Sequence, residues 1–148
     1  MRHPRHSGLP QNVVADYIAQ HAEEWVDAWL ESVRRDPTTP RYHDYPDPQE
    51  LTRDAAASYH YLGLWLRTGD WDSRIDPYFE RIGRVRREEG FRLSDVISAF
   101  LLAKRHLWDG MIAGNQLSVA LEIEIANAIR LFYDQAIYHT VLGYESVP

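Results

Sequence analysis

Apolar residues recur every three or four positions along most of this chain, which is the spacing of one face of an α-helix. The pattern is clearest over residues 94–113, where one side carries Val96, Ile97, Phe100, Ala103, Leu107 and Met111. No segment alternates apolar and polar residues with a period of two, so no strand is predicted. We therefore expect an all-α chain of five helices joined by short loops. The other four helices are expected over residues 11–35, 47–67, 74–89 and 117–142.

Prolines and glycines mark the ends of these helices. The Asp36–Pro37 pair ends the first one, because a residue before proline resists the helical conformation. Asp47 is suited to cap the second helix and Pro48 to occupy its first turn. Gly90 follows the charged last turn of the third helix, and we expect it to close that helix in the left-handed conformation that glycine tolerates.

The segment 36–47 contains three prolines and three aspartates, so we expect an irregular loop there. Its side chains Tyr42, His43 and Tyr45 have two interpretations. They cover the ends of neighbouring helices, or they fold over a pocket.

The chain is long enough for one domain with its own core, since 45% of its 148 residues are hydrophobic. We place the domain at residues 11–143, between tails over 1–10 and 144–148, because Gly143 is the expected end of the last helix. No apolar run approaches the roughly 20 residues that span a bilayer, and the N-terminal residues lack the apolar stretch of a secretory signal. We therefore expect a cytoplasmic protein with no membrane partner.

Composition and motifs exclude several kinds of chemistry. The chain has no cysteine, which rules out disulfides, thiolate catalysis and cysteine-based metal sites. Its net charge of −6 disfavours nucleic acid as a partner. It has no glycine-rich phosphate loop, no GxSxG elbow and no HExxH motif. His21, His60 and His106 lie on three different predicted helices, so no metal site is indicated. We expect a protein that is not an enzyme.

The first helix carries more apolar residues than one narrow stripe requires. Trp25 and Trp29 lie on one side, and Val26 is rotated about 100° from Trp25. We expect the surplus to be buried between two copies of the chain. The expected face of this homodimer combines residues of the first and last helices, namely Tyr17, Val26, Phe132, Tyr133 and Ile137.

Four arginines surround the apolar side of the third helix: Arg81, Arg84, Arg86 and Arg87. One interpretation is a solvated helix face, balanced by nearby glutamates. The other is a patch that binds a partner protein or an anion, and the sequence leaves both open.

Aromatic residues are abundant, with five tryptophans and nine tyrosines. They build cores in most helical proteins. The alternative is an aromatic-lined ligand pocket, whose expected residues are Trp25, Tyr59, Trp65 and Trp108.

A series of short motifs in a fixed order carries a resemblance to a known family. They include Arg35-Asp36-Pro37 after the tryptophan helix, Arg67-Thr68-Gly69-Asp70, the segment Gly83 to Leu93, Leu107-Trp108, and a closing Phe132-Tyr133-Asp134-x-Ala136-Ile137-Tyr138. Together they resemble the N-terminal domain of the RsbR/RsbRD group of bacterial stress regulators, a haem-free relative of the globin fold.

This resemblance implies a globin-like helical bundle that serves as a sensory or regulatory input domain, often as a homodimer. In the family such a domain is usually fused to an output of the STAS or histidine-kinase type, and it supplies no catalytic residues. A haem would need a proximal histidine, and the predicted helix in the corresponding place, residues 74–89, has none. We therefore expect no cofactor and a non-enzymatic signal-input or protein-interaction domain. The alternative functions are a small-molecule sensor and, less well supported, a haem-binding globin-like protein.

Overall fold

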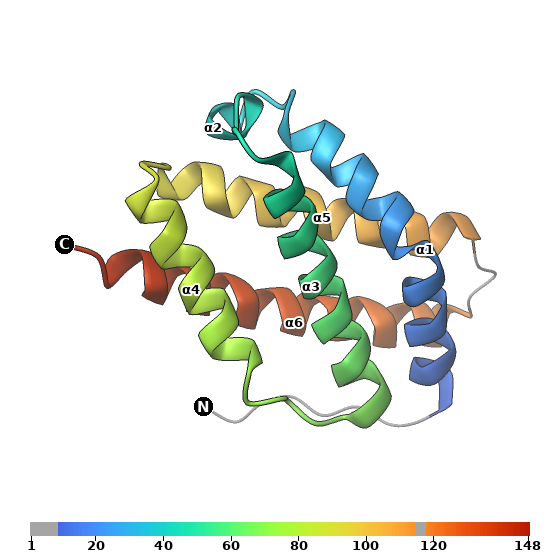
Figure 1. Cartoon of the computed structure of the whole chain (residues 1–148). Coiled ribbons are helices and arrows are strands. Elements are labelled where there is room, and N and C mark those ends of the chain that lie inside the picture. Colours follow the sequence, from blue (N-terminus) through green and yellow to red (C-terminus); the bar gives the residue numbers. More distant parts are fainter. Residues whose placement is uncertain (1–8, 115–117) are drawn as a thin grey trace.

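The computed structural model describes residues 9–114 and 118–148, and its regular structure is entirely helical (Figure 1). The prediction of an all-α chain is thereby confirmed. The helices are α1 (Leu9–Val33), α2 (Pro40–His43), α3 (Pro48–Thr68), α4 (Ile75–Glu88), α5 (Leu93–Gly114) and α6 (Val119–Glu145). Most of the predicted tail over residues 1–10 lies outside the described residues, as does the predicted start of the last helix at Leu117.

The described residues contain six helices, so the expected number of five is wrong. The additional element is α2, one turn inside the segment predicted to be an irregular loop. Pro40 occupies its first position, where the fixed φ of proline suits a helix and the missing N–H costs little. Tyr42 is buried and anchors this turn to the core.

The helices form two layers that cross each other. In Figure 1, α1, α3 and α4 lie in front, and α5 and α6 run across behind them. Within this arrangement α1 packs on both α3 and α5, and α4 packs along α6. The core between the layers is rich in aromatic side chains, of which Trp65, Phe79, Phe132 and Tyr133 are fully buried.

The tightest contact is the crossing of α4 and α6. A side chain at Gly83 would collide with the backbone of Thr140, and one at Gly143 would collide with the backbone of Glu80. The sequence analysis placed the end of the last helix at Gly143, and this is wrong, because α6 continues to Glu145. Gly143 permits close helix packing here and does not end the helix.

Candidate functional site

Arg86 stands at the centre of the candidate site, and the end of α4 fixes its position. The amide of Phe91 donates to the carbonyl of Arg86 at 2.9 Å, and the amide of Gly90 donates to the carbonyl of Arg87 at 3.0 Å. Gly90 has a φ of 84°. This pair of bonds is the Schellman pattern of a helix terminus. The predicted left-handed conformation at Gly90 is therefore confirmed.

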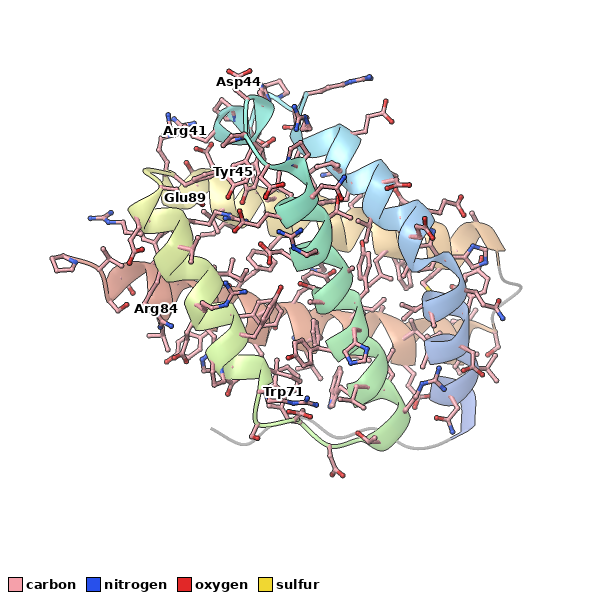
Figure 2. The ribbon with its side chains drawn as sticks, viewed as in Figure 1. Arg41, Asp44, Tyr45, Trp71, Arg84 and Glu89 are labelled. Atoms are coloured by element: carbon pink, nitrogen blue, oxygen red, sulfur yellow. The ribbon has the colours of Figure 1, made fainter. Side chains whose placement is uncertain are left out.

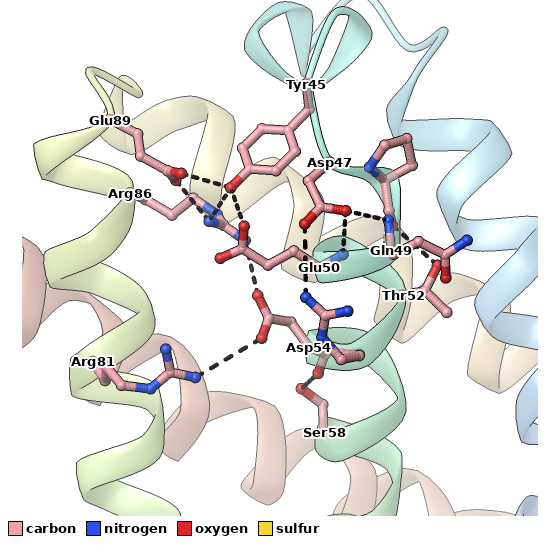
Figure 3. A network of polar contacts seen from close by, with 12 residues as sticks. Tyr45, Asp47, Gln49, Glu50, Thr52, Asp54, Ser58, Arg81, Arg86 and Glu89 are labelled. Atoms are coloured by element: carbon pink, nitrogen blue, oxygen red, sulfur yellow. Dashed lines mark hydrogen bonds and ion pairs between the residues drawn. The ribbon is translucent and has the colours of Figure 1, made fainter.

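The guanidinium of Arg86 is buried in a polar network (Figure 3). Its Nη1 donates to Glu89 Oε1 at 2.8 Å and to the Tyr45 hydroxyl at 3.3 Å, and its Nη2 donates to Asp54 Oδ2 at 3.0 Å. The rings of Tyr45 and Phe91 lie 5.2 and 5.4 Å from its central carbon, within cation–π range. The network thus joins α4, α3 and the segment after α2.

Asp54 connects this network to the surface between α3 and α4. Arg81 Nη2 lies 3.9 Å from Asp54 Oδ1, and the Tyr78 hydroxyl donates to the Asp54 backbone carbonyl at 3.0 Å. Burial raises the pKa of the Asp54 carboxyl, while Arg86 and Arg81 act in the opposite direction. Asp54 therefore joins the two helices through both its side chain and its backbone.

A cavity lies beside the network, between α3, α4 and α5. It offers about 50 Å³ to the centres of water-sized molecules, and none of its lining residues is exposed. The walls are mainly aromatic and aliphatic, and they are formed by Trp29, Tyr42, Asp54, Ala55, Ser58, Tyr59, Tyr78, Phe79, Ile82, Arg86, Val96, Ala99, Phe100, Ala103 and Tyr133. Tyr42 is thus one of the lining residues, and the interpretation that this loop covers a ligand pocket stays a prediction.

Two residues of the cavity lining carry a polar atom that has no hydrogen-bond partner among the described residues, Tyr133 Oη and Arg86 Nε. Both residues are buried, with relative exposures of 2%. A buried group without a partner costs about 1–3 kcal/mol, and such groups are rare in folded proteins. Burial also raises the pKa of the Tyr133 hydroxyl well above its usual range, so this group keeps its proton.

Only one of the four residues predicted for an aromatic ligand pocket lies in the wall of this cavity. Tyr59 lines the cavity, whereas Trp25, Trp65 and Trp108 do not. Trp25 fills the space that a side chain at Gly110 of α5 would occupy. Trp65 packs on Phe132, with ring centroids 6.2 Å apart, and Trp108 packs against the same core cluster. The prediction was wrong for these three tryptophans, because they are needed to fill the core between the layers.

The arginine patch is also only partly found on the surface. Arg81, Arg84 and Arg87 are exposed, and Arg84 points away from the bundle (Figure 2). Arg86 is buried, so its assignment to a surface patch is wrong. The four-residue spacing from Ile82 turns Arg86 towards the core, and its charge is balanced by carboxylates there.

The predicted dimer face includes residues that the single chain already buries. Val26, Phe132 and Tyr133 have relative exposures of 2% or less, so their placement on an exposed face is wrong. Val26 is buried because α1 is covered by α3 as well as by α5, so more of its circumference is enclosed than one narrow stripe. Tyr17 and Ile137 are half-buried.

The histidines of α1, α3 and α5 do not converge. His21 contacts Glu24 at 3.3 Å, His106 contacts Ser32 at 2.7 Å, and His60 is exposed. Across residues 9–114 and 118–148, no group of three or more potential ligands is arranged to hold a metal ion.

His139 on α6 was not singled out from the sequence. Its Nδ1 lies 2.7 Å from Glu80 Oε2 and its Nε2 lies 3.3 Å from Asp76 Oδ2, both on α4. His139 is distant in sequence from Asp76 and Glu80, so the crossing of α4 and α6 brings it to them.

The comparisons with known proteins bear on what this arrangement serves. None of the helices in the described part of the chain is long and apolar enough to cross a membrane. A search of curated proteins found no match. A family model described as the RsbT co-antagonist protein rsbRD N-terminal domain matches residues 19–147. That match covers most of the chain, including all of α3 to α6, and the chain therefore belongs to the RsbRD N-terminal domain family.

Proposed function

We propose that this chain is a non-enzymatic signal-input domain of a bacterial stress or signalling regulator. The observation that carries the proposal is the family match over residues 19–147. The chemistry of the candidate site agrees with it. The cavity walls are mainly apolar, and its one charged pair joins Arg86 to Asp54. Such a lining suits recognition of a ligand or a change in helix packing better than bond cleavage.

We also propose that the helices are arranged as in the globin fold and that the protein is located in the cytoplasm. Its output is proposed to act through another protein or domain. We expect that output to be of the STAS or kinase type, as the family implies. We do not expect haem to be the input, since none of the cavity's lining residues in the described part of the chain is a histidine.

We expect the input to reach the last turn of α6 through the end of α4. Arg86 lines the cavity, and the Phe91 amide binds its carbonyl. The Tyr144 hydroxyl in turn donates to the Phe91 carbonyl at 2.8 Å. The guanidinium of Arg87 lies 4.9 Å from the centre of the Tyr144 ring. A shift of Arg86 would therefore displace the final turn of α6 through two hydrogen bonds. The first joins the Phe91 amide to the Arg86 carbonyl, and the second joins the Tyr144 hydroxyl to the Phe91 carbonyl.

A homodimer is part of the proposal, with a contact surface that differs from the one the sequence suggested. The outward side of α6 carries exposed apolar residues towards both ends, Val119 and Ile123 near its start and Tyr138 and Leu142 near its end. Between them lies the ion pair of Arg130 and Asp134, with a separation of 3.3 Å. These positions lie four residues apart, except for one interval of seven between Ile123 and Arg130, and therefore follow one side of the helix. A second copy of α6 would cover its apolar ends and find charged partners at its centre.

A domain exchange tests the signalling role. The N-terminal domain of an RsbRD-type regulator is replaced by this chain, its own STAS domain is kept, and a stress-dependent reporter is measured in the host. We expect the chimera to restore a stress response that the STAS domain alone does not give. Tyr144→Phe, which removes the bond to Phe91, should weaken the response, while Tyr61→Phe on α3 should not. A chimera no more active than the isolated STAS domain would refute the proposal.

Sedimentation equilibrium tests the homodimer. The unmodified chain should show a dimer mass at micromolar concentration. The pair Ile123→Glu and Tyr138→Glu should give a folded monomer, because each change buries a charge in the proposed contact. Ala56→Glu, an exposed site on α3, serves as the matched control and should leave the dimer intact. A monomeric wild type at high concentration would argue against self-association.

A further inference from the structure

Two residues that line the cavity between α3, α4 and α5 each carry a hydrogen-bond donor that no other group of the described residues uses. These donors are the Tyr133 hydroxyl and the Arg86 Nε–H group, both buried and both on residues that line the cavity. We propose that this cavity binds a small, neutral organic molecule with an apolar body and a carbonyl-type acceptor, which takes hydrogen bonds from Tyr133 and Arg86.

The hydrogen bonds already present define what such a molecule must offer. The Tyr59 hydroxyl donates to the Ala103 carbonyl at 3.3 Å, and the Ser58 hydroxyl donates to the Asp54 carbonyl at 3.1 Å. The Trp29 indole and the Tyr78 hydroxyl are likewise bonded to backbone carbonyls. The remaining Nε–H can only donate, because a guanidinium has no acceptor. A bound molecule must therefore supply an acceptor.

The charges around Arg86 favour a neutral molecule over an anion. The guanidinium already has a carboxylate on each side, Asp54 at 3.0 Å and Glu89 at 2.8 Å. Glu50 also approaches, since it accepts a hydrogen bond from Tyr45 in the same network (Figure 3). Arg81 adds only one further positive charge, at 3.9 Å from Asp54. A third or fourth negative charge in this space would meet more repulsion than attraction.

The size of the cavity limits the molecule to a few non-hydrogen atoms. About 50 Å³ is open to the centres of water-sized molecules, which is enough for more than a single water but leaves no room for a drug-sized ligand. We therefore expect a molecule of four or five non-hydrogen atoms. The rest of the wall, including Phe79, Ile82, Val96 and Ala99, would contact its apolar part.

The lining residues Asp54, Ser58 and Tyr78 of α3 and α4 are half-buried. The contacts of Asp54 with Tyr78, Arg81 and Arg86 bridge the two helices at this place. A bound molecule would therefore lie beside the residues that hold α4 to α3.

This inference deepens the proposed function by naming the class of input, and it rests on that function only for its biological meaning. Binding is measured on the isolated chain without any signalling readout. If the chain binds the molecule but the chimera does not signal, the proposed function fails and the ligand inference stands. If the chimera signals but the chain does not bind the molecule, the ligand inference fails and the proposed function stands.

Three probes with five non-hydrogen atoms each test the chemistry: 2-butanone, its alkene isostere 2-methyl-1-butene, and the anion propionate. Each is titrated into ¹⁵N-labelled protein to about 50 mM, or to its solubility limit if that is lower, because molecules this small bind weakly. We expect 2-butanone to move the Arg86 Nε–H signal and the amide signals of Tyr133 and Ala99. The alkene can accept neither hydrogen bond, so its binding should be more than tenfold weaker. Propionate should bind at least as weakly as the alkene.

Two substitutions of the same kind complete the test. Tyr133→Phe removes one of the two donors and keeps the ring, so it should weaken 2-butanone binding roughly tenfold. Tyr61→Phe makes the same change outside the cavity and should leave binding unchanged. Equal shifts with ketone and alkene, or no shift of the Arg86 Nε–H signal, would overturn the proposal and leave a cavity that holds only water. Tighter binding of propionate than of 2-butanone would overturn the assignment of a neutral ligand.

Discussion

Replacing Arg86 by methionine is the most direct test of how the candidate site is held together. Methionine retains the long unbranched stem but removes the guanidinium. The change deletes the bonds to Glu89, Asp54 and Tyr45, and also the cation–π contacts with Tyr45 and Phe91. The half-buried Asp54 carboxylate then loses its closest positive partner.

The expected loss of unfolding free energy depends on the partners that Asp54 and Glu89 keep after Arg86 is replaced. Removing one member of a buried ion pair typically costs about 3–5 kcal/mol. Asp54 keeps Arg81 at 3.9 Å, and the Glu89 side chain is 33% exposed and can turn towards water. We therefore expect a loss near the lower end, about 3 kcal/mol at pH 7.5. For a chain of this length that corresponds to a fall in Tm of about 10 °C.

The loss of stability in Arg86→Met should depend on pH, and the direction of this dependence is set by the protonation of Asp54. Burial raises the pKa of Asp54 above its ordinary value of 3.8, and Arg86 limits the rise. A carboxyl whose folded-state pKa is raised lowers stability progressively as the pH rises from the unfolded-state value through the folded-state value. Without Arg86 the folded-state pKa of Asp54 rises further. The difference in unfolding free energy between Arg86→Met and wild type should thus be small near pH 4 and full at pH 7.5.

Urea denaturation at the two pH values measures this difference, and two further variants serve as controls. Arg84→Met makes the same change at an exposed site of the same helix and should alter stability by less than about 0.5 kcal/mol. Adding Asp54→Asn to Arg86→Met removes the unpaired carboxylate and should restore part of the loss at pH 7.5. An effect below 0.5 kcal/mol for Arg86→Met, or an equal effect at both pH values, would refute the reasoning.

Three other predictions follow from the packing and the ligand chemistry. Gly143→Ala should destabilise by at least about 3 kcal/mol or prevent folding, because the added carbon meets backbone, whereas Gly63→Ala, with open space around it, should be neutral or slightly stabilising in thermal melts. Gly90→Val should cost about 1–2 kcal/mol, since a β-branched side chain is strained at a φ of 84°, and an unchanged urea midpoint would contradict this. The purified protein should show no Soret band after haem addition and desalting. A stoichiometric band that His60→Ala or His106→Ala abolishes would contradict the last prediction.

Local patterns were enough to predict the long helices. Their apolar spacing, the Asp47–Pro48 start and the Gly90 end each depend on neighbours within one turn. Asp47 indeed accepts hydrogen bonds from the amides of Gln49 and Glu50. The turn α2 was missed because it depends on the burial of Tyr42 against residues far away in the sequence, among them Phe91.

The candidate site was harder to predict because its members come from different segments. Arg86 did carry a signal, since it continues the stripe of Ile75, Phe79 and Ile82 at four-residue spacing, but a charged residue flanked by arginines looks solvated. The partner carboxylates Asp54 and Glu89 become identifiable only when α3 and α4 are placed side by side. Tyr133 posed the opposite difficulty. Its apolar ring suggested a surface for a second copy, and only the packed core shows that its hydroxyl is enclosed.

The crossing of α4 and α6 makes these two helices one mechanical body. Backbone meets backbone at Gly83 and Gly143, so neither helix can slide or roll on the other without moving apart. The helices α1 and α3 form a second closely packed pair. The cavity lies between these two pairs and α5, so a displacement of one pair against the other would change its volume. Asp54 belongs to the second pair and bonds to the first, so such a displacement would have to stretch or break its contacts with Arg81 and Arg86.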